Sequence, residues 1–130
     1  MKKIAILFVA LVCLSPVFGH EDTDRSPAWP GVRAIHLLKH PACEACGATG
    51  AGVQLEVHHV VPFHIDRTKE LDPTNLITLC RKGGHLGCPC HLTFGHLGNF
   101  QRDNPNVRED AALMRSRLRA AYERARTLPK

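Results

Sequence analysis

Cysteines at metal-ligand spacing are the first feature of this sequence that indicates chemistry. A CxxC pair and a second group follow residue 40: Cys43, Cys46, Cys80, Cys88 and Cys90. A structural zinc ion takes four soft ligands at the corners of a tetrahedron, and two tight turns can present them without a large core. The spacing predicts a zinc site with the first three cysteines as ligands. Cys90 is the preferred fourth ligand because it adjoins His91, and Cys88 is the alternative.

Two other interpretations of these cysteines stay open. An exported chain could pair four of them in two disulfides and keep one free thiol. A CxxC pair can also be a redox motif, which normally opens a helix after a strand. Here the pair follows Pro41 in a turn rich in glycine, so the zinc interpretation is favoured.

A second constellation combines imidazoles with one amide: His58, His59, Asn75, His91 and His96. The segments around them read VHHVVPF, DPTNLITLC and CHLTFGH, with CEACG upstream and WPGVRAIHLLKHP before that. Taken in this order, the segments resemble the HNH endonuclease family, and the resemblance covers residues 29–100. A lone histidine pair would carry little information, but the ordered set is specific.

The resemblance implies an α+β fold, a small zinc-stabilised ββα-metal domain with flanking helices. It also implies an enzyme that holds one divalent ion against a scissile phosphate, usually of DNA. His58 resembles the first metal ligand of the family, and His91 and His96 resemble the remaining two. His59 resembles the general base that takes a proton from the attacking water. Asn75 resembles the central asparagine, which helps to fix the loop and to orient the base.

Phosphodiester hydrolysis suits these side chains. A neutral imidazole, with an unperturbed pKa near 6.5, can accept a proton from water at neutral pH, and a divalent cation stabilises the charge on the phosphate as a Lewis acid. Three imidazoles are softer ligands than carboxylates, so zinc, manganese or nickel should bind more tightly than magnesium. The expected cofactors are therefore a structural Zn²⁺ and one catalytic Mg²⁺, Mn²⁺, Zn²⁺ or Ni²⁺, without a small-molecule cofactor.

Two spacings depart from the commonest family pattern. Five residues separate His91 from His96, which places them about 140° apart on a regular helix. The backbone must therefore deviate, and Gly95 is the expected position; His85 is the alternative ligand. The segment RKGGHLGCP between Cys80 and Cys90 is also long, which leaves both candidates for the fourth zinc ligand open.

The adjacent histidines pose a further geometric problem. Neighbouring side chains on an ideal strand face opposite sides, so His58 and His59 share a site only if the strand ends or twists there, as Pro62 suggests. His64 follows five residues after the expected base and is a candidate phosphate contact. The other histidines are expected on the surface or next to the site: His20, His36 and His40.

Short secondary-structure elements must position these residues, because a chain of 130 residues forms one small domain. Apolar residues predict a short helix over 32–38, which ends before Pro41 and has Trp29 near its beginning. Alternation predicts a strand over 53–58, and a second strand is expected over 75–80 and pairs with the first. A brief helical segment follows His91. A longer helix is predicted over 107–127.

The chain is expected to divide into a signal peptide (1–19), a mobile leader (20–28), the HNH nuclease domain (29–100) and a basic C-terminal helix (101–130). Lys2 and Lys3 precede an apolar stretch that is too short to span a bilayer, which predicts export to the periplasm or the medium without stable membrane insertion. Residues 101–130 carry eight basic and four acidic side chains. These charges fit either a solvated helix face or contact with phosphates.

The sequence thus predicts an exported HNH endonuclease that hydrolyses phosphodiester bonds in DNA, or in RNA, with little sequence preference. The alternative is a catalytically inactive HNH-like module that binds nucleic acid or zinc. Cleavage of nucleic acid in the presence of a divalent ion distinguishes the two.

Overall fold

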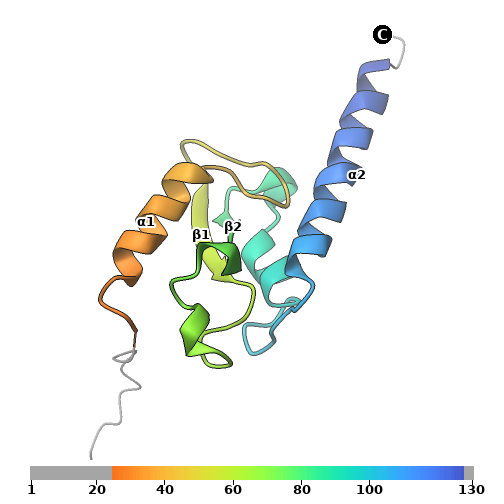
Figure 1. Ribbon diagram of the computed structural model, residues 1–130. Coiled ribbons are helices and arrows are strands. Elements are labelled where there is room, and N and C mark those ends of the chain that lie inside the picture. Colours follow the sequence, from red (N-terminus) through yellow and green to blue (C-terminus); the bar gives the residue numbers. More distant parts are fainter. Residues whose placement is uncertain (1–24, 128–130) are drawn as a thin grey trace, which may run out of the picture.

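A β-hairpin lies at the centre of the computed structural model, which describes residues 25–127 (Figure 1). Strands β1 (Gln54–His59) and β2 (Leu76–Lys82) pair antiparallel. Helix α1 (Trp29–Lys39) packs against one side of the hairpin, and the π-helical turn η4 (His91–Gly95) packs on the other side, next to helix α2 (Val107–Thr127). Three short 3₁₀ turns complete the elements: η1 (Arg67–Lys69), η2 (Pro73–Asn75) and η3 (His85–Gly87).

This arrangement confirms the predicted α+β class, with two antiparallel strands followed by helices. Both predicted strands form, with β1 shifted by one residue and β2 extended to Lys82. Helix α1 begins at Trp29, earlier than the apolar pattern indicated, because Pro30 fits the first turn of a helix without the loss of a hydrogen bond. The expected signal peptide and the first part of the expected leader lie outside the described residues. Within residues 25–127, no helix has the length and apolar character needed to cross a membrane.

Strand β2 is covered on both faces. Its first five residues, 76–80, are all buried. A strand buried on both sides has a continuous apolar run instead of alternation, as its sequence LITLC shows. The register pairs His58 with Ile77 and His59 with Leu76, so both histidines lie at the end of β1 beside the most buried part of the hairpin.

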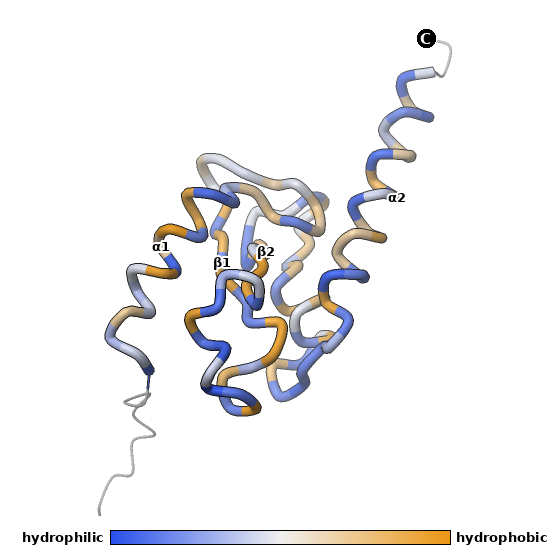
Figure 2. The backbone as a smooth tube through the Cα atoms, in the orientation of Figure 1, coloured by the Kyte–Doolittle hydropathy of each residue, from blue (hydrophilic) through white to orange (hydrophobic). Residues whose placement is uncertain are grey.

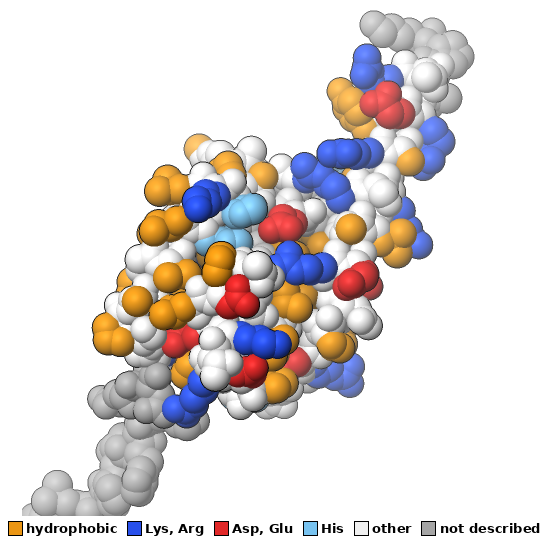
Figure 3. Space-filling model, viewed as in Figure 1, with side chains coloured by type: hydrophobic (Ala, Val, Ile, Leu, Met, Phe, Trp, Pro, Cys, Tyr) orange, Lys and Arg blue, Asp and Glu red, His pale blue; other side chains and the backbone are white. Residues whose placement is uncertain are grey.

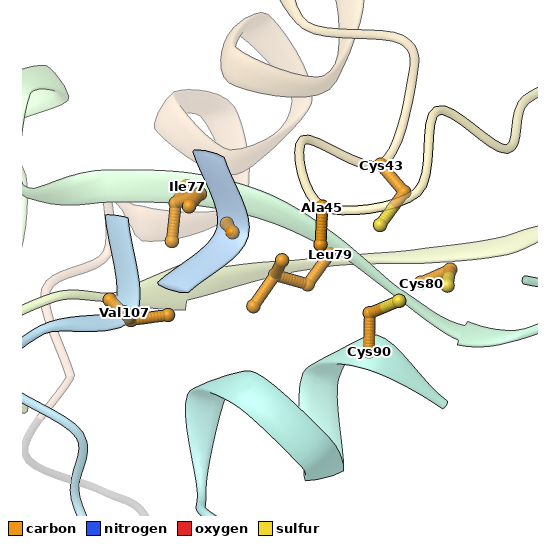
Figure 4. Packing of buried hydrophobic residues seen from close by; sticks show 8 residues of the cluster. Cys43, Ala45, Ile77, Leu79, Cys80, Cys90 and Val107 are labelled. Atoms are coloured by element: carbon orange, nitrogen blue, oxygen red, sulfur yellow. The ribbon is translucent and has the colours of Figure 1, made fainter. Parts of the chain in front are cut away.

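The core is small, and sulfur makes up much of it. Its fully buried members are three aliphatic side chains, two alanines and three cysteines: Ile77, Leu79, Val107, Ala45, Ala111, Cys43, Cys80 and Cys90. Figure 4 shows the sulfur atoms gathered at one end of this cluster, with Ile77 and Val107 at the other end. A core of this size rarely stabilises a domain alone, so cross-linking at the cysteine end is expected to matter.

Helix α2 leaves the body of the domain. Val107 and Ala111 are buried near its beginning, whereas residues 119–127 are all exposed. Figure 1 shows its last turns projecting away from the hairpin, and Figure 2 shows hydrophilic positions recurring along it. The helix coincides with the predicted segment 107–127.

Candidate active site

Four cysteines converge at one end of the core. Their sulfur atoms all lie within 4.8 Å of one another: Cys43, Cys46, Cys80 and Cys90. The first two come from the turn after α1, the third from β2, and the fourth from the residue before η4. Cys46 Sγ lies 3.7 Å from Cys80 Sγ, and the backbone N–H of His85 donates to Cys46 Sγ over 3.5 Å. Such a donor set fits tetrahedral zinc.

The structure distinguishes the two candidates for the fourth position. Cys90 belongs to the group, whereas Cys88 lies outside it, with its sulfur 3.6 Å from Cys90 Sγ. The long segment between Cys80 and Cys90 forms a tight loop that returns the chain to the cysteine cluster. A Cβ on Gly84 would lie 2.6 Å from Cys80 Sγ and closer still to the carbonyl oxygen of Cys88, so the loop can close this tightly only with glycine there.

The pKa values of the clustered thiols are shifted in opposite directions. Burial raises the pKa of Cys80 to about 12. A hydrogen bond from Cys90 lowers the pKa of Cys43 to about 4, and the same bond raises the pKa of Cys90. One thiolate is therefore stabilised by thiols that stay protonated. A divalent ion would supply the positive charge that four neighbouring thiolates require.

Three histidines form a second cluster on the η4 side of the hairpin. His58, His91 and His96 each offer a ring nitrogen, and these nitrogens lie within 4.8 Å of one another. The ring centroids are 4.9–5.3 Å apart. His58 is buried and the other two are partly buried. Three converging imidazoles with partial access to solvent fit a divalent ion that keeps open coordination positions.

The π-helical turn solves the spacing of five residues. Hydrogen bonds in a π-helix join residues i and i+5, which brings side chains five apart onto nearly the same side. Gly95 closes this turn beneath the His58 ring. A Cβ on Gly95 would lie 3.0 Å from both Cε1 and Nδ1 of His58 and 3.3 Å from Cδ2 of His91. The backbone deviation expected at Gly95 therefore extends over the whole π-helical turn. Because Gly95 has no side chain, the turn can approach β1 closely.

This close approach leads to a first prediction. Gly95→Ala should weaken binding of a divalent ion at the three histidines by about tenfold or more, because the new methyl group displaces the His58 ring. Titration calorimetry with Mn²⁺ would measure the change. Gly31→Ala is the control, because a Cβ there meets no atom within 4 Å. Equal affinities of the two variants would contradict the expectation.

A hydrogen bond to the backbone orients His96. Its Nδ1 lies 2.8 Å from the carbonyl oxygen of Arg102, and a carbonyl can only accept, so Nδ1 carries the proton. Nε2 then keeps its lone pair for a metal ion, which is a common arrangement for ligating histidines. The ring of Phe100 lies 5.1 Å from that of His96 and 5.9 Å from that of His91, and it adds an apolar side to the cluster.

His59 leaves β1 on the opposite side from His58. Its ring lies 4.5 Å from that of Trp29 of α1, at an interplanar angle of 36°, and its Nε2 lies 2.9 Å from the carbonyl oxygen of Glu70. Nε2 therefore donates, and Nδ1 keeps its lone pair. Burial lowers the pKa of His59, which keeps the ring neutral. The pleat of β1 thus persists through both histidines, and the ring of His59 is not part of the three-histidine cluster.

Asn75 fixes the loop that carries the partner of His59. Its Oδ1 accepts from the N–H of Val61, and its Nδ2 donates to the carbonyl oxygens of Val61 and Lys69 at 3.0 and 3.1 Å. Lys69 directly precedes Glu70, so these bonds hold the carbonyl that receives the His59 proton. Sequence patterns gave no sign of Glu70, because a backbone carbonyl has no signature in the sequence.

The remaining predicted histidines lie outside both clusters. His64 is exposed, and its Nε2 lies 3.2 Å from a carboxylate oxygen of Asp103. His85 contributes its backbone to the cysteine cluster and not its ring to the histidines. His36 and His40 stack on each other at 4.4 Å. His20 lies outside the described residues.

Burial of His58 predicts how stability depends on pH. Burial, and then the charges of the neighbouring histidines, lower the pKa of His58 to about 3. In the unfolded chain its pKa is near 6.5, so the unfolded state binds more protons between these values. Stability is full above about pH 6.5 and is lost progressively as pH falls toward 3.

Melting temperatures without added divalent ions should therefore fall between about pH 7 and pH 5. His58→Asn removes the titrating ring and should flatten this dependence relative to the unmodified protein. Circular dichroism melts of both proteins measure the difference. Parallel slopes would show that another group is responsible.

Comparison with known protein families now adds independent information. Residues 43–82 match the family model described as HNH endonuclease. The match contains the hairpin, His58, His59, Asn75 and three of the four clustered cysteines, and it ends before η4. Residues 43–82 therefore correspond to the HNH endonuclease family that the sequence motifs predicted. Searches among characterised proteins and among solved structures give no significant match.

Proposed function

We propose that this protein is an exported, metal-dependent nuclease that hydrolyses phosphodiester bonds in DNA with little sequence preference. The convergence of His58, which lies in the HNH match, with His91 and His96 beyond it carries the proposal. Export rests on the signal-like sequence of residues 1–19. Weak sequence preference follows from the small size of the domain, because little beyond backbone contacts remains once the site is assigned.

The three histidines would hold one divalent ion through neutral ring nitrogens. Such an ion supplies Lewis-acid stabilisation of the charge that builds up on the phosphate. Burial keeps the His58 and His91 rings neutral because it lowers both pKa values. The Arg102 carbonyl selects the tautomer of His96 that leaves Nε2 available. These features leave ring-nitrogen lone pairs available before the metal ion binds.

His59 is the proposed general base. Its Nε2–H is held by the Glu70 carbonyl, so the free Nδ1 is the atom that accepts a proton from water. Packing against Trp29 holds the ring in one orientation and excludes solvent from one face. Asn75 acts through the loop that carries Glu70 and is a positioning residue. The proposal requires the attacking water to reach Nδ1 at the end of β1.

Plasmid cleavage tests the proposal. The purified mature protein should convert supercoiled DNA to nicked and then linear forms when Mg²⁺, Mn²⁺, Zn²⁺ or Ni²⁺ is added, and EDTA should stop the reaction. His91→Ala should abolish cleavage. DNA binding without cleavage under all four ions would instead support the inactive nucleic-acid-binding or zinc-binding module. The mass of the protein recovered from the periplasm or medium tests export separately.

A further inference from the structure

A groove runs between helix α2 and the turn that carries the CxxC pair. Its volume is about 630 Å³, and it lies on a part of the surface that the proposed catalytic residues do not line. Its charged lining is mostly basic, with Arg108, Arg115 and Arg119 from α2 and Glu44 from the turn; His40 at the end of α1 also lines it. Glu44 is already engaged, because its Oε1 accepts from the N–H of Thr78.

The three arginines form one stripe along α2. At 100° per residue, positions 108, 115 and 119 lie within about 40° of one another on the helix surface. The stripe extends about 16 Å along the helix axis, at 1.5 Å per residue. Arg117 and Arg124 point to the opposite side, about 160–180° away. The groove therefore gathers three like charges from one helix face, although such charges repel unless an anion lies between them.

Backbone carbonyls, and not carboxylates, hold the first two arginines. Arg108 donates to the carbonyl oxygens of Thr74 and Leu76. Arg115 donates to the carbonyl oxygen of Cys43 at 3.4 Å and lies directly over Gly47, where any Cβ would collide with its guanidinium. Among residues 25–127, none of the three has an acidic ion-pair partner. The positions of Arg108 and Arg115 are thus fixed by carbonyl oxygens and not by ion pairs.

We propose that this groove binds the sugar-phosphate backbone of duplex DNA, with Arg108, Arg115 and Arg119 as its phosphate contacts. The inference rests on the proposed nuclease function, which makes DNA the expected partner. Guanidinium groups suit phosphate because their planar N–H donors match its oxygens. Two of them are anchored before binding, which lowers the entropic cost of the contact.

The length of the stripe favours an extended anion over a small one. About 16 Å corresponds to about five steps of one DNA strand at 3.4 Å per step. Figure 3 shows basic side chains, all of them arginine on α2, continuing along this helix beyond the body of the domain. A single phosphate or small ligand would leave part of the charge of the three groove arginines without a counterion.

Two pairs of substitutions on the same helix test the inference. Arg115→Ala with Arg119→Ala removes charge from the groove, and Arg117→Ala with Arg124→Ala removes the same charge from the opposite face. Fluorescence anisotropy with a short labelled DNA duplex, without added divalent ions, gives the Kd as a function of salt. The groove pair should lower the slope of log Kd against log salt by about two, whereas the opposite-face pair should leave it unchanged.

The single variant Arg119→Ala controls for unfolding of the variant protein. Arg119 is exposed, whereas Arg115 contacts the turn that carries the CxxC pair, so that its loss could destabilise the fold. Arg119→Ala should lower the slope by about one at an unchanged melting temperature, and Arg117→Ala should not. Equal losses from both faces, no loss from either, or no binding of DNA by the unmodified protein would each overturn the inference. Loss specific to the groove supports it even if plasmid cleavage fails, and in that case only the nuclease proposal falls. If the unmodified protein cleaves DNA and the groove pair still binds DNA normally, the groove inference is overturned and the nuclease proposal stands.

Discussion

Cys90→Ser should prevent zinc binding at the four-cysteine cluster and abolish cooperative unfolding of the domain. Cys90 is one of four sulfur atoms within 4.8 Å and is fully buried beside Cys43 and Cys80. Structural zinc contributes about 10–16 kcal/mol of binding free energy in small zinc-dependent domains. That is comparable to the whole stability of a typical protein, about 5–15 kcal/mol. With only three large aliphatic side chains fully buried in the core cluster, little else holds the described fold together.

Cys88→Ser is the matched control. It makes the same chemical change two residues away, at a sulfur outside the cluster. Zinc content, measured by mass spectrometry under native conditions, and the thermal transition should both match those of the unmodified protein. If both serine variants lose zinc equally, the assignment of the fourth ligand is wrong. A mass two hydrogens lower per cysteine pair, without zinc, would instead support the disulfide interpretation.

His59→Ala should reduce DNA cleavage by about 10²- to 10⁴-fold, the usual contribution of general acid–base catalysis. The reason is the loss of Nδ1, whose lone pair is kept free by the bond from Nε2 to the Glu70 carbonyl. Binding of Mn²⁺ should change little, because the His59 ring lies outside the three-histidine cluster. Initial rates with a labelled duplex and calorimetric metal binding measure the two effects separately.

Two further histidine variants make this result specific. His58→Ala should lose both the metal ion and the activity, because its ring is a member of the cluster. His64→Ala should keep both the metal ion and the activity. Its ring is exposed, lies outside the three-histidine cluster and contacts the carboxylate of Asp103. Free imidazole in the buffer should restore part of the activity of His59→Ala, since it can replace a base but not a structural side chain. Near-normal cleavage by His59→Ala would exclude His59 as the base.

Local patterns explain why the elements could be predicted. Alternation in VQLEVH and the apolar run LITLC each report on a strand through their immediate neighbours. The periodic apolar residues of 107–127 similarly predicted α2. The predicted helices and strands differ from the observed ones mainly at their ends. Helix α1 begins at Trp29, for example, because a helix can begin at any of several adjacent residues. The resemblance to a family added expected roles for single residues, such as metal ligand or general base, which composition alone does not assign.

The details of the site depended on contacts between distant segments. The five-residue spacing from His91 to His96 is unsuitable for a regular helix, and the π-helical turn brings Gly95 close to the His58 ring on β1, which lies far away in the sequence. The side on which His59 lies, and the Glu70 carbonyl that holds it, also involve residues far apart in sequence. Backbone carbonyls, unlike side chains, are present at every residue, so no pattern identifies the one that is used.

The sequence by itself determined which ligand types are present, that a hairpin carries the segments VHHVVPF and DPTNLITLC, and that a basic helix follows. Tertiary structure alone decided that Cys90 and not Cys88 joins the sulfur cluster, and that three arginines of α2 face the CxxC turn. The physical reason is range. Periodicity and turn chemistry act over a few residues, whereas a tetrahedral site or a charged groove depends on how the chain closes loops of tens of residues.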